Sequence, residues 1–219
     1  MKISASMMNV LTWLLFSWLS GSQLFMHVWG CKMSERGLDD KTKALILDLH
    51  NKARQKVANG EESGQPPASN MKELHWDNEI AAIAQRVAEN CIFQHTPQAQ
   101  RTTKNYEYLG ENIYAGSYPD PIPRSVKKWY EEVKDVTPAI VSSYSKPGNA
   151  IIGHFTQMVY ANTEALGCGY AKSADDGEAF VFCLYGPGGN YPGKPVYKQG
   201  SPASECKNGK STRYNGLCK

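Results

Sequence analysis

The sequence predicts an α+β fold. Up to about residue 160, apolar residues recur every three or four positions in four separate stretches, as in amphipathic helices. Beyond residue 164 the pattern changes to the two-residue alternation of strands around a turn. At 219 residues, with 41% hydrophobic and 21% charged residues, the chain is long enough for one layered domain with a single core.

The first helix is expected at residues 38–60. Asp39 or Asp40 can cap its N-terminus and Gly60 ends it. Residues 61–70 are rich in Pro, Gly and Ser and predict a loop. The expected apolar stripe of this helix consists of Leu45, Ile46, Leu49, Ala53 and Val57.

A second helix starts after Asp77, whose carboxylate is a good N-cap. A polar loop follows at 96–106, and residues 109–115 predict a short strand. One side of this second helix is apolar and carries Ile80, Ile83, Ala84, Val87, Ala88 and Cys91.

Two more helices are predicted before the strands. A Pro-rich turn at 120–123 leads into a helix at 124–135, and a shorter helix is expected at 149–160. Their apolar positions are Val126, Trp129, Tyr130 and Val133 in the former, and Ile151, Phe155, Met158 and Val159 in the latter.

The last predicted element is a hairpin of strands 165–173 and 178–185 around the turn 175–177. Cys168 and Cys183 are equidistant from the middle of that turn. In an antiparallel hairpin they therefore lie directly opposite each other, about 4.5 to 5.5 Å apart at Cα, which a disulfide can bridge. Geometry alone thus pairs Cys168 with Cys183.

The N-terminal segment predicts secretion. Lys2 is followed by an apolar run at 10–19 that has the length of a signal-peptide core and is too short to span a bilayer. Ser20 and Ser22 favour cleavage after residue 22, and cleavage after residue 30 is the alternative. We therefore expect a signal peptide at 1–22, an extracellular location and no integral membrane segment, against the alternative of an uncleaved membrane anchor.

Composition narrows the possible partners. The six cysteines are an even number, which in a secreted chain predicts three disulfides, and counting leaves their connectivity open. The sequence has no C-x-x-C spacing typical of a zinc site. A net charge of +3 is too weak and too evenly spread for nucleic acid. We expect a monomer.

Four titratable residues lie on or beside predicted elements: His95, Glu111, Glu132 and His154. Their spacing alone does not show that they converge. Such residues beside apolar stripes are more often hydrogen-bonded structural groups than ligands, so both interpretations stay open.

Several ordered motifs carry a resemblance to a known family. They are L-x-x-H-N-x-x-R at 47–54, P-P-A-S-N-M-K-E-L-H-W at 66–76, G-H-F-T-Q-M-V-Y-A-N-T at 153–163 and F-V-F-C-L-Y-G-P-G-G-N-Y at 180–191. Together they resemble the CAP superfamily, and the phrase A-N-T-x-x-L-G-C-G is close to the antigen 5 branch of arthropod venom allergens.

The resemblance implies a three-layer α-β-α sandwich. It divides the chain into a CAP domain at 31–191 and a Gly/Pro-rich, hinge-like C-terminal extension at 192–219 closed by a disulfide. It also implies the remaining disulfides, Cys31 with Cys91 and Cys206 with Cys218. The second pair is supported because two further cysteines common in such a hinge are replaced here, one of them by Ala203.

The resemblance further implies that His95, Glu111, Glu132 and His154 line a central cleft. Two imidazoles and two carboxylates could bind a divalent cation such as zinc, weakly and reversibly, or form a hydrogen-bonded network instead. Opposite charges nearby would favour protonated histidines, which exclude the metal. No cofactor is required in either case.

The expected function is that of a secreted, non-enzymatic effector, a venom or salivary toxin or allergen that modulates ion channels, for example calcium channels. The alternative is an extracellular carrier of sterols or fatty acids, with a groove formed by Tyr106, Tyr108, Trp129 and Tyr130. The partner is thus an unidentified channel, receptor or lipid. A serine-type protease is the third and least favoured hypothesis, because no serine stands in a G-x-S-x-G context and Thr96 follows His95.

Overall fold

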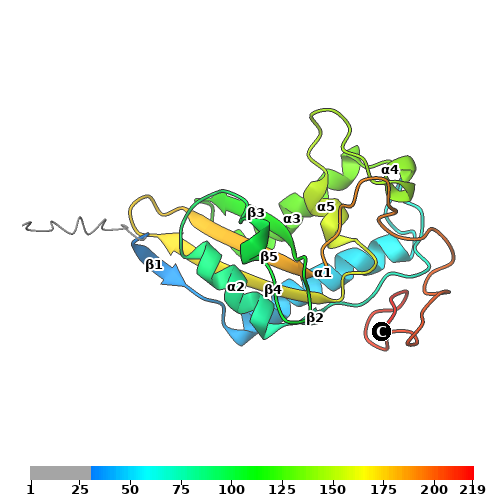
Figure 1. The fold of residues 1–219 in the computed structure, drawn as a ribbon, viewed down its shortest axis with the longest axis horizontal. Helices are drawn as coiled ribbons and strands as arrows, with labels where there is room; N and C mark the ends of the chain where they lie inside the picture. Colours follow the sequence, from blue (N-terminus) through cyan, green and yellow to red (C-terminus); the bar gives the residue numbers. More distant parts are fainter. Residues whose placement is uncertain (1–30) are drawn as a thin grey trace, which may run out of the picture.

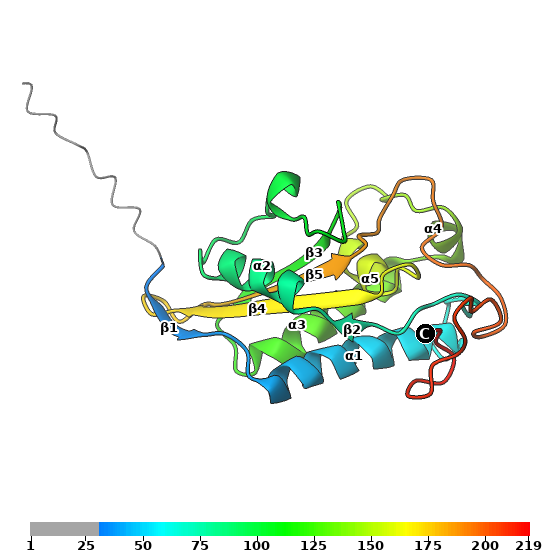
Figure 2. The same ribbon diagram turned by 60° about the horizontal axis from the view of Figure 1, so that its bottom comes forward.

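A β-sheet separates two helical layers in the computed structural model, which describes residues 31–219 (Figures 1 and 2). The predicted signal peptide and both of its cleavage points lie outside the described residues. Within them the sheet has five strands in the order β1-β4-β5-β3, and β2 pairs in parallel with the start of β4. The strands are β1 (Met33–Arg36), β2 (His75–Trp76), β3 (Gly110–Gly116), β4 (Ala165–Ser173) and β5 (Ala179–Gly186).

The helices cover both faces of the sheet, as Figure 2 shows edge-on. One face carries α2 (Asn78–Ala88), and its contacts form the smaller apolar core. The other face carries the larger core. The helices on this face are α1 (Asp40–Ala58), α3 (Pro121–Tyr130), α4 (Pro138–Ser142) and α5 (Gly153–Met158). Elsewhere in the chain, short 3-10 turns occupy Gln98–Gln100 and Glu131–Asp135. This arrangement confirms the predicted α-β-α sandwich.

Small residues on β4 allow α2 to lie directly on the sheet. The face of β4 toward α2 alternates Ala165, Gly167, Gly169 and Ala171. A Cβ atom on Gly169 would stand 2.3 Å from the backbone nitrogen of Gln85, where no side chain fits. Glycine is therefore required here for close approach of two backbones.

The stripe predicted for the first helix is partly wrong. Asp39 is the N-cap, accepting a hydrogen bond from Thr42 N, but Leu45 is 42% exposed. Ile46 and Val57 are buried and Leu49 and Ala53 pack against the larger core, as predicted, but the same side also carries the polar residues His50, Asn51 and Arg54, all fully buried. These polar side chains are buried because they form hydrogen bonds to distant segments of the chain, and hydrophobic periodicity contains no information about such bonds.

Arg54 is the most densely bonded of these side chains. Its guanidinium donates to the carbonyl oxygens of Lys72 and of residues 158, 160, 161 and 163, at 2.8 to 3.4 Å. Among residues 31–219 no carboxylate lies within 4 Å of it. Burial lowers the pKa of Arg54 to about 9, so the group stays charged at neutral pH and its charge is solvated by peptide dipoles alone.

Other element boundaries differ from the sequence expectation. The third helix begins at Pro121, because proline is tolerated in a first turn. The fourth covers only Gly153–Met158, and the second ends at Ala88 before Cys91, which has a positive φ of 51°. The short elements α4, β1 and β2 were not expected, since two to five residues give no readable period.

All three predicted disulfides are present. Cys168 and Cys183 are paired in register across β4 and β5, with Cα atoms 4.1 Å apart. Cys31–Cys91 and Cys206–Cys218 have Cα separations of 5.7 and 5.1 Å. The described residues contain no free cysteine.

The C-terminal residues 192–219 contain no helix or named strand but pack against the domain. Tyr197 and Leu217 are buried in the larger core. Backbone hydrogen bonds join Val196 N to Val141 O and Cys218 N to Met71 O. The tail is therefore held against the face of the sheet that carries the larger core. No helix within residues 31–219 is both long and apolar enough to cross a membrane.

Candidate functional site

A cavity of about 370 Å³ opens between the start of α5, the start of β3 and the loops that flank them. It has a mixed lining of imidazole, carboxylate, phenol and amide groups together with the cationic side chains of Arg101 and Lys146. Its principal side chains are His95, Tyr108, Glu111, Tyr144, His154 and Asn190. Three of the four predicted cleft residues therefore share one cavity, and the fourth, Glu132, lies behind His154.

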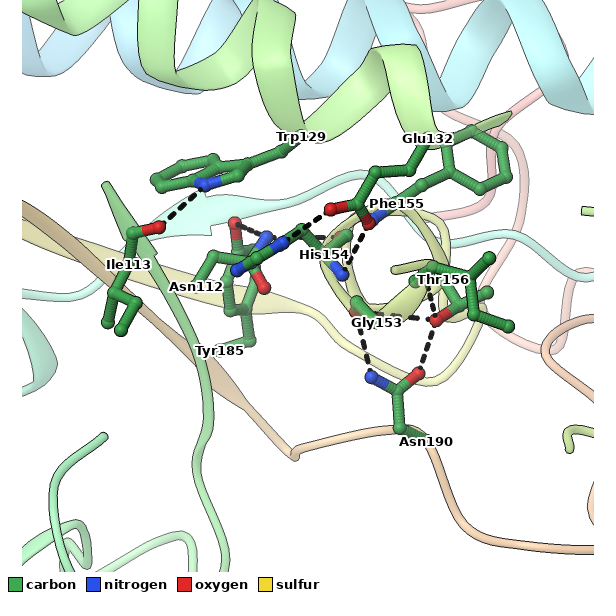
Figure 3. A network of polar contacts seen from close by, with 11 residues as sticks. Asn112, Ile113, Trp129, Glu132, Gly153, His154, Phe155, Thr156, Tyr185 and Asn190 are labelled. Carbon is green, nitrogen blue, oxygen red and sulfur yellow. Dashed lines mark hydrogen bonds and ion pairs between the residues drawn. The ribbon is translucent and has the colours of Figure 1, made fainter. Parts of the chain in front are cut away.

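Glu132 holds His154 and the start of α5 in place (Figure 3). One carboxylate oxygen lies 2.5 Å from His154 Nδ1, and the other accepts from the backbone N–H groups of His154 and Phe155 at 2.9 and 3.0 Å. The residue before this helix, Ile152, offers no side-chain cap. Glu132 therefore caps α5 from another element and orients the imidazole at the same time.

Glu111 makes an equivalent pair with His95. Its Oε2 lies 2.7 Å from His95 Nδ1 and accepts from Thr96 N at 3.0 Å. The Glu111 side chain is fully buried, whereas the His95 side chain is 59% exposed. The other carboxylate oxygen, Oε1, is buried and has no hydrogen-bond partner within residues 31–219. An unpartnered buried carboxylate oxygen in a cavity wall marks a place for a polar ligand.

These pairs change the predicted metal shell. In each pair the carboxylate binds Nδ1, so the Nε2 atom of each ring is left without a protein partner among the described residues. Within residues 31–219 no group of three or more His, Cys, Asp or Glu side chains is placed to hold one ion. The expectation that all four side chains converge into one shell is thus not met, because each glutamate is occupied in orienting its histidine.

A buried relay connects the site to α1. His50 Nδ1 lies 2.8 Å from Ile46 O, a pure acceptor, so Nδ1 carries the proton. Its Nε2 then accepts from the Tyr185 hydroxyl at 2.9 Å, and that hydroxyl accepts from Asn112 Nδ2 at 3.0 Å. Asn112 also donates to His154 O, so the relay ends on the helix that carries the cleft histidine (Figure 3).

Residues that the sequence did not single out complete the cleft. Asn190, in a left-handed conformation with φ of 63°, donates to Gly153 O at 2.8 Å and accepts from Thr156 Oγ1 at 2.7 Å. Gln157 Oε1 accepts from Gly189 N at 2.8 Å. Gln157 lies within the motif at 153–163 and Asn190 within the motif at 180–191. Their position in these motifs is the sequence feature that could have identified them as residues of the cleft.

The four aromatic residues proposed for a lipid groove are not brought together. Trp129 is 2% exposed and donates its indole N–H to Ile113 O, and Tyr130 bonds Glu62. Tyr106 bonds Glu164, while Tyr108 lies in the cleft with its ring 5.6 Å from that of Tyr191. Each aromatic ring thus has a separate packing role.

The relay predicts a pH dependence of stability. Burial lowers the pKa of His50 from 6.5 to about 4. In the unfolded chain the imidazole of His50 is therefore protonated below about pH 6.5, whereas in the folded chain it is protonated only below about pH 4. The contribution of neutral His50 to the free energy of unfolding is complete above pH 6.5. It falls by on the order of 3 kcal/mol as the pH drops to about 4.

Urea unfolding of the parent and of His50→Gln at pH 7.0 and pH 4.5 measures this. The variant should be less stable at pH 7.0 but lose less stability on acidification. His75→Gln, at an exposed position, is the control and should behave as the parent. Equal acid sensitivity of the parent and His50→Gln would contradict the prediction.

Comparisons with known proteins agree with this geometry. The sequence model of the family described as CAP, the cysteine-rich secretory protein family, matches residues 47–185. Scoloptoxin SSD552 from Scolopendra dehaani is 67% identical over 189 residues, covering 86% of this chain and 89% of that protein. Venom allergen 5 from Tityus serrulatus is 35% identical and covers 86% of this chain and 50% of its own length.

Solved structures of similar proteins share the fold. Na-ASP-1 superposes with a TM-score of 0.72 at 33% identity, over 85% of this chain and 49% of the other. A structure described as NaASP2 with Zn²⁺ gives a TM-score of 0.70 at 31% identity, over 87% of this chain and all of the other. The family match covers more than half of the chain, and the scoloptoxin covers most of its length. The chain therefore belongs to the cysteine-rich secretory protein (CAP) family.

Proposed function

We propose that this chain is a secreted venom protein that acts by binding an extracellular target of prey or host. The observation that carries the proposal is the 67% identity to scoloptoxins over 86% of the chain. Three disulfides in the described residues support export into an oxidising compartment. A non-catalytic role is supported by the cleft, whose imidazoles each bind a carboxylate and whose lining contains no serine or cysteine within residues 31–219.

The proposed targets are ion channels, with voltage-gated calcium channels as the first to test. A rigid, disulfide-bonded domain keeps its binding surface ordered outside the cell, which limits the entropy lost on binding. Current through these channels should fall when the purified chain is applied from the extracellular side, and recover on washing. Reduced and alkylated protein is the control. Unchanged currents across the voltage-gated channel classes would refute channel modulation.

The cleft supports a second proposal, that it binds zinc weakly. The proposed ligands are the Nε2 atoms of His95 and His154, because both residues line the same cavity and neither Nε2 has a protein partner within residues 31–219. Carboxylates at Nδ1 are the usual orienting partners of zinc-bound histidines. The similar protein whose structure was solved with Zn²⁺ also supports zinc binding as a proposal for this chain. With few protein ligands, the ion should exchange readily.

Calorimetric titration with zinc tests this proposal. Binding at pH 7.5 should weaken strongly at pH 5.5, because only neutral imidazoles bind the metal and protons compete with it for the ring nitrogens. His95→Ala combined with His154→Ala should abolish the heat of binding while the domain stays folded. Gln98→Ala, on a nearby exposed turn, is the control. Undiminished binding by the double variant would place the metal elsewhere.

Lipid binding is the alternative function, and a different groove favours it. A cavity of about 720 Å³ lies where the start of α1 meets the start of α3. Leu38, Leu45 and Ile122 are among its lining residues, which places the exposed Leu45 in an open groove whose walls also carry the charged side chains Glu35, Arg36 and Asp39.

Native mass spectrometry of protein from its own source tests lipid binding. A carried sterol or fatty acid should appear as added mass on the parent and be lost in Leu45→Arg. That substitution leaves the core intact because the side chain is already 42% exposed. A bare chain in every preparation would contradict the alternative.

A further inference from the structure

The two edges of the sheet differ in how they face solvent. The β1 edge is short and polar, with exposed Ser34, Glu35 and Arg36, and its register with β4 shifts between Met33 and Glu35. Short length, charges and irregular register are the usual protections of an edge strand. The opposite edge, β3, ends in Asn112–Gly116, a stretch without a charge or proline. This edge lacks those protections.

Strand register identifies the backbone groups that β3 leaves free. Cys168 and Cys183 lie 4.1 Å apart at Cα, the spacing of a pair that does not exchange hydrogen bonds. Cys183 therefore directs its backbone groups toward β3, where it is paired with Asn112. By alternation Asn112, Tyr114 and Gly116 bond within the sheet, while the N–H and C=O groups of Ile113 and Ala115 point outward.

One of these outward groups is already used. The Trp129 indole N–H donates to Ile113 O at 3.0 Å, as Figure 3 shows. The N–H of Ile113 and both groups of Ala115 have no hydrogen bond within residues 31–219. Ile113 is only 7% exposed and lies under Trp129, so the two backbone groups of the partly exposed Ala115 are the ones left on the open side of β3.

A groove of about 570 Å³ runs along this part of the edge. Ile113, Tyr114 and Ala115 form one wall, and Phe93 and Ile151 stand on its rim at 60% and 64% exposure. These two belong to a small set of large hydrophobic side chains that the described residues expose. Exposed apolar side chains beside unpaired edge groups are typical of an interaction site.

The charges around the groove are of both signs. Lys128 pairs with Glu131 at 3.2 Å and Glu132 pairs with His154, whereas Lys134 and Asp135 have no ion-pair partner within residues 31–219. A surface of one sign, such as an anionic membrane, finds no matching potential here. A polypeptide complements such a rim, because it can carry both charges and offers alternating backbone donors and acceptors.

We propose that the free edge of β3 binds an extended segment of the target protein by strand addition, with an apolar side chain of that segment between Phe93 and Ile151. Ala115 is the anchor, because one residue of an added strand can bond both its N–H and its C=O. A second copy of this chain is the less favoured occupant. The two open backbone groups of Ala115 offer little toward the roughly 800 Å² per partner that a stable dimer needs.

Ala115→Pro tests the edge directly. Proline removes the outward N–H and blocks pairing, yet it is tolerated on an edge strand where that N–H faces solvent. Ala115→Ser keeps the N–H and is the matched control. Phe93→Ser combined with Ile151→Ser alters only exposed side chains, and it keeps the test valid if the proline variant does not fold.

The probe is a displayed library of random twelve-residue peptides, selected on the full chain with zinc chelated. Selected peptides should carry apolar residues at alternate positions. Their Kd should rise about ten-fold for Ala115→Pro and for the double serine variant, and stay unchanged for Ala115→Ser. Amide exchange at Ala115 should slow on binding.

Failure to enrich such peptides, or binding that is insensitive to both the Ala115→Pro and double serine variants, would overturn the proposal. Sedimentation showing a dimer of the parent that Ala115→Pro dissociates would replace the peptide by a second copy. The proposal that a segment of the target protein occupies the β3 edge rests on the proposed function of binding an extracellular target. The two claims are separable, because a chain that binds peptides at this edge but leaves channel currents unchanged refutes only the channel.

Discussion

The buried guanidinium of Arg54 is the interaction on which the geometry of the cleft depends. It collects carbonyl oxygens from the C-terminal end of α5 and from the turn that leads into β4. The six residues of α5 are too few to form a stable helix alone. Their carbonyl end is held by a cation, as the helix dipole favours, and their N–H end by the Glu132 carboxylate. His154 therefore owes its position to side chains on two other elements.

In the two His–Glu pairs of the cleft, the two nitrogen atoms of each imidazole have different roles. Each carboxylate fixes its imidazole through Nδ1, and each ring keeps Nε2 for whatever enters the cavity. The side chains of His154 and Glu132 are only 22% and 12% exposed, whereas the side chain of His95 is 59% exposed and lies at the mouth of the cavity. One histidine is thus fixed by the helical layer, and the other is open to solvent and to a ligand.

Strand β3 links the cleft to the outer edge of the molecule. Its outward-pointing backbone positions are Glu111, Ile113 and Ala115. The first serves the cavity through its carboxylate, the second is capped by Trp129, and the third is left open. The close seating of α2 on the glycines of β4 fixes the sheet behind this strand, so both regions rest on a rigid support.

The sequence by itself determined whatever depends on neighbours along the chain. Apolar periodicity located α1, α2 and α3, Asp39 and Asp77 marked N-caps, and the symmetry of one hairpin paired Cys168 with Cys183. Motif resemblance supplied the sandwich and the four cleft residues without their geometry.

Only the tertiary structure decided that polar side chains share the buried side of α1 and which atom of each cleft residue is occupied. Arg54 reaches carbonyls more than one hundred residues away, and Glu132 caps a helix 22 residues later. Such bonds form because a buried polar group must find a partner wherever the fold offers one, and no local period encodes that partner.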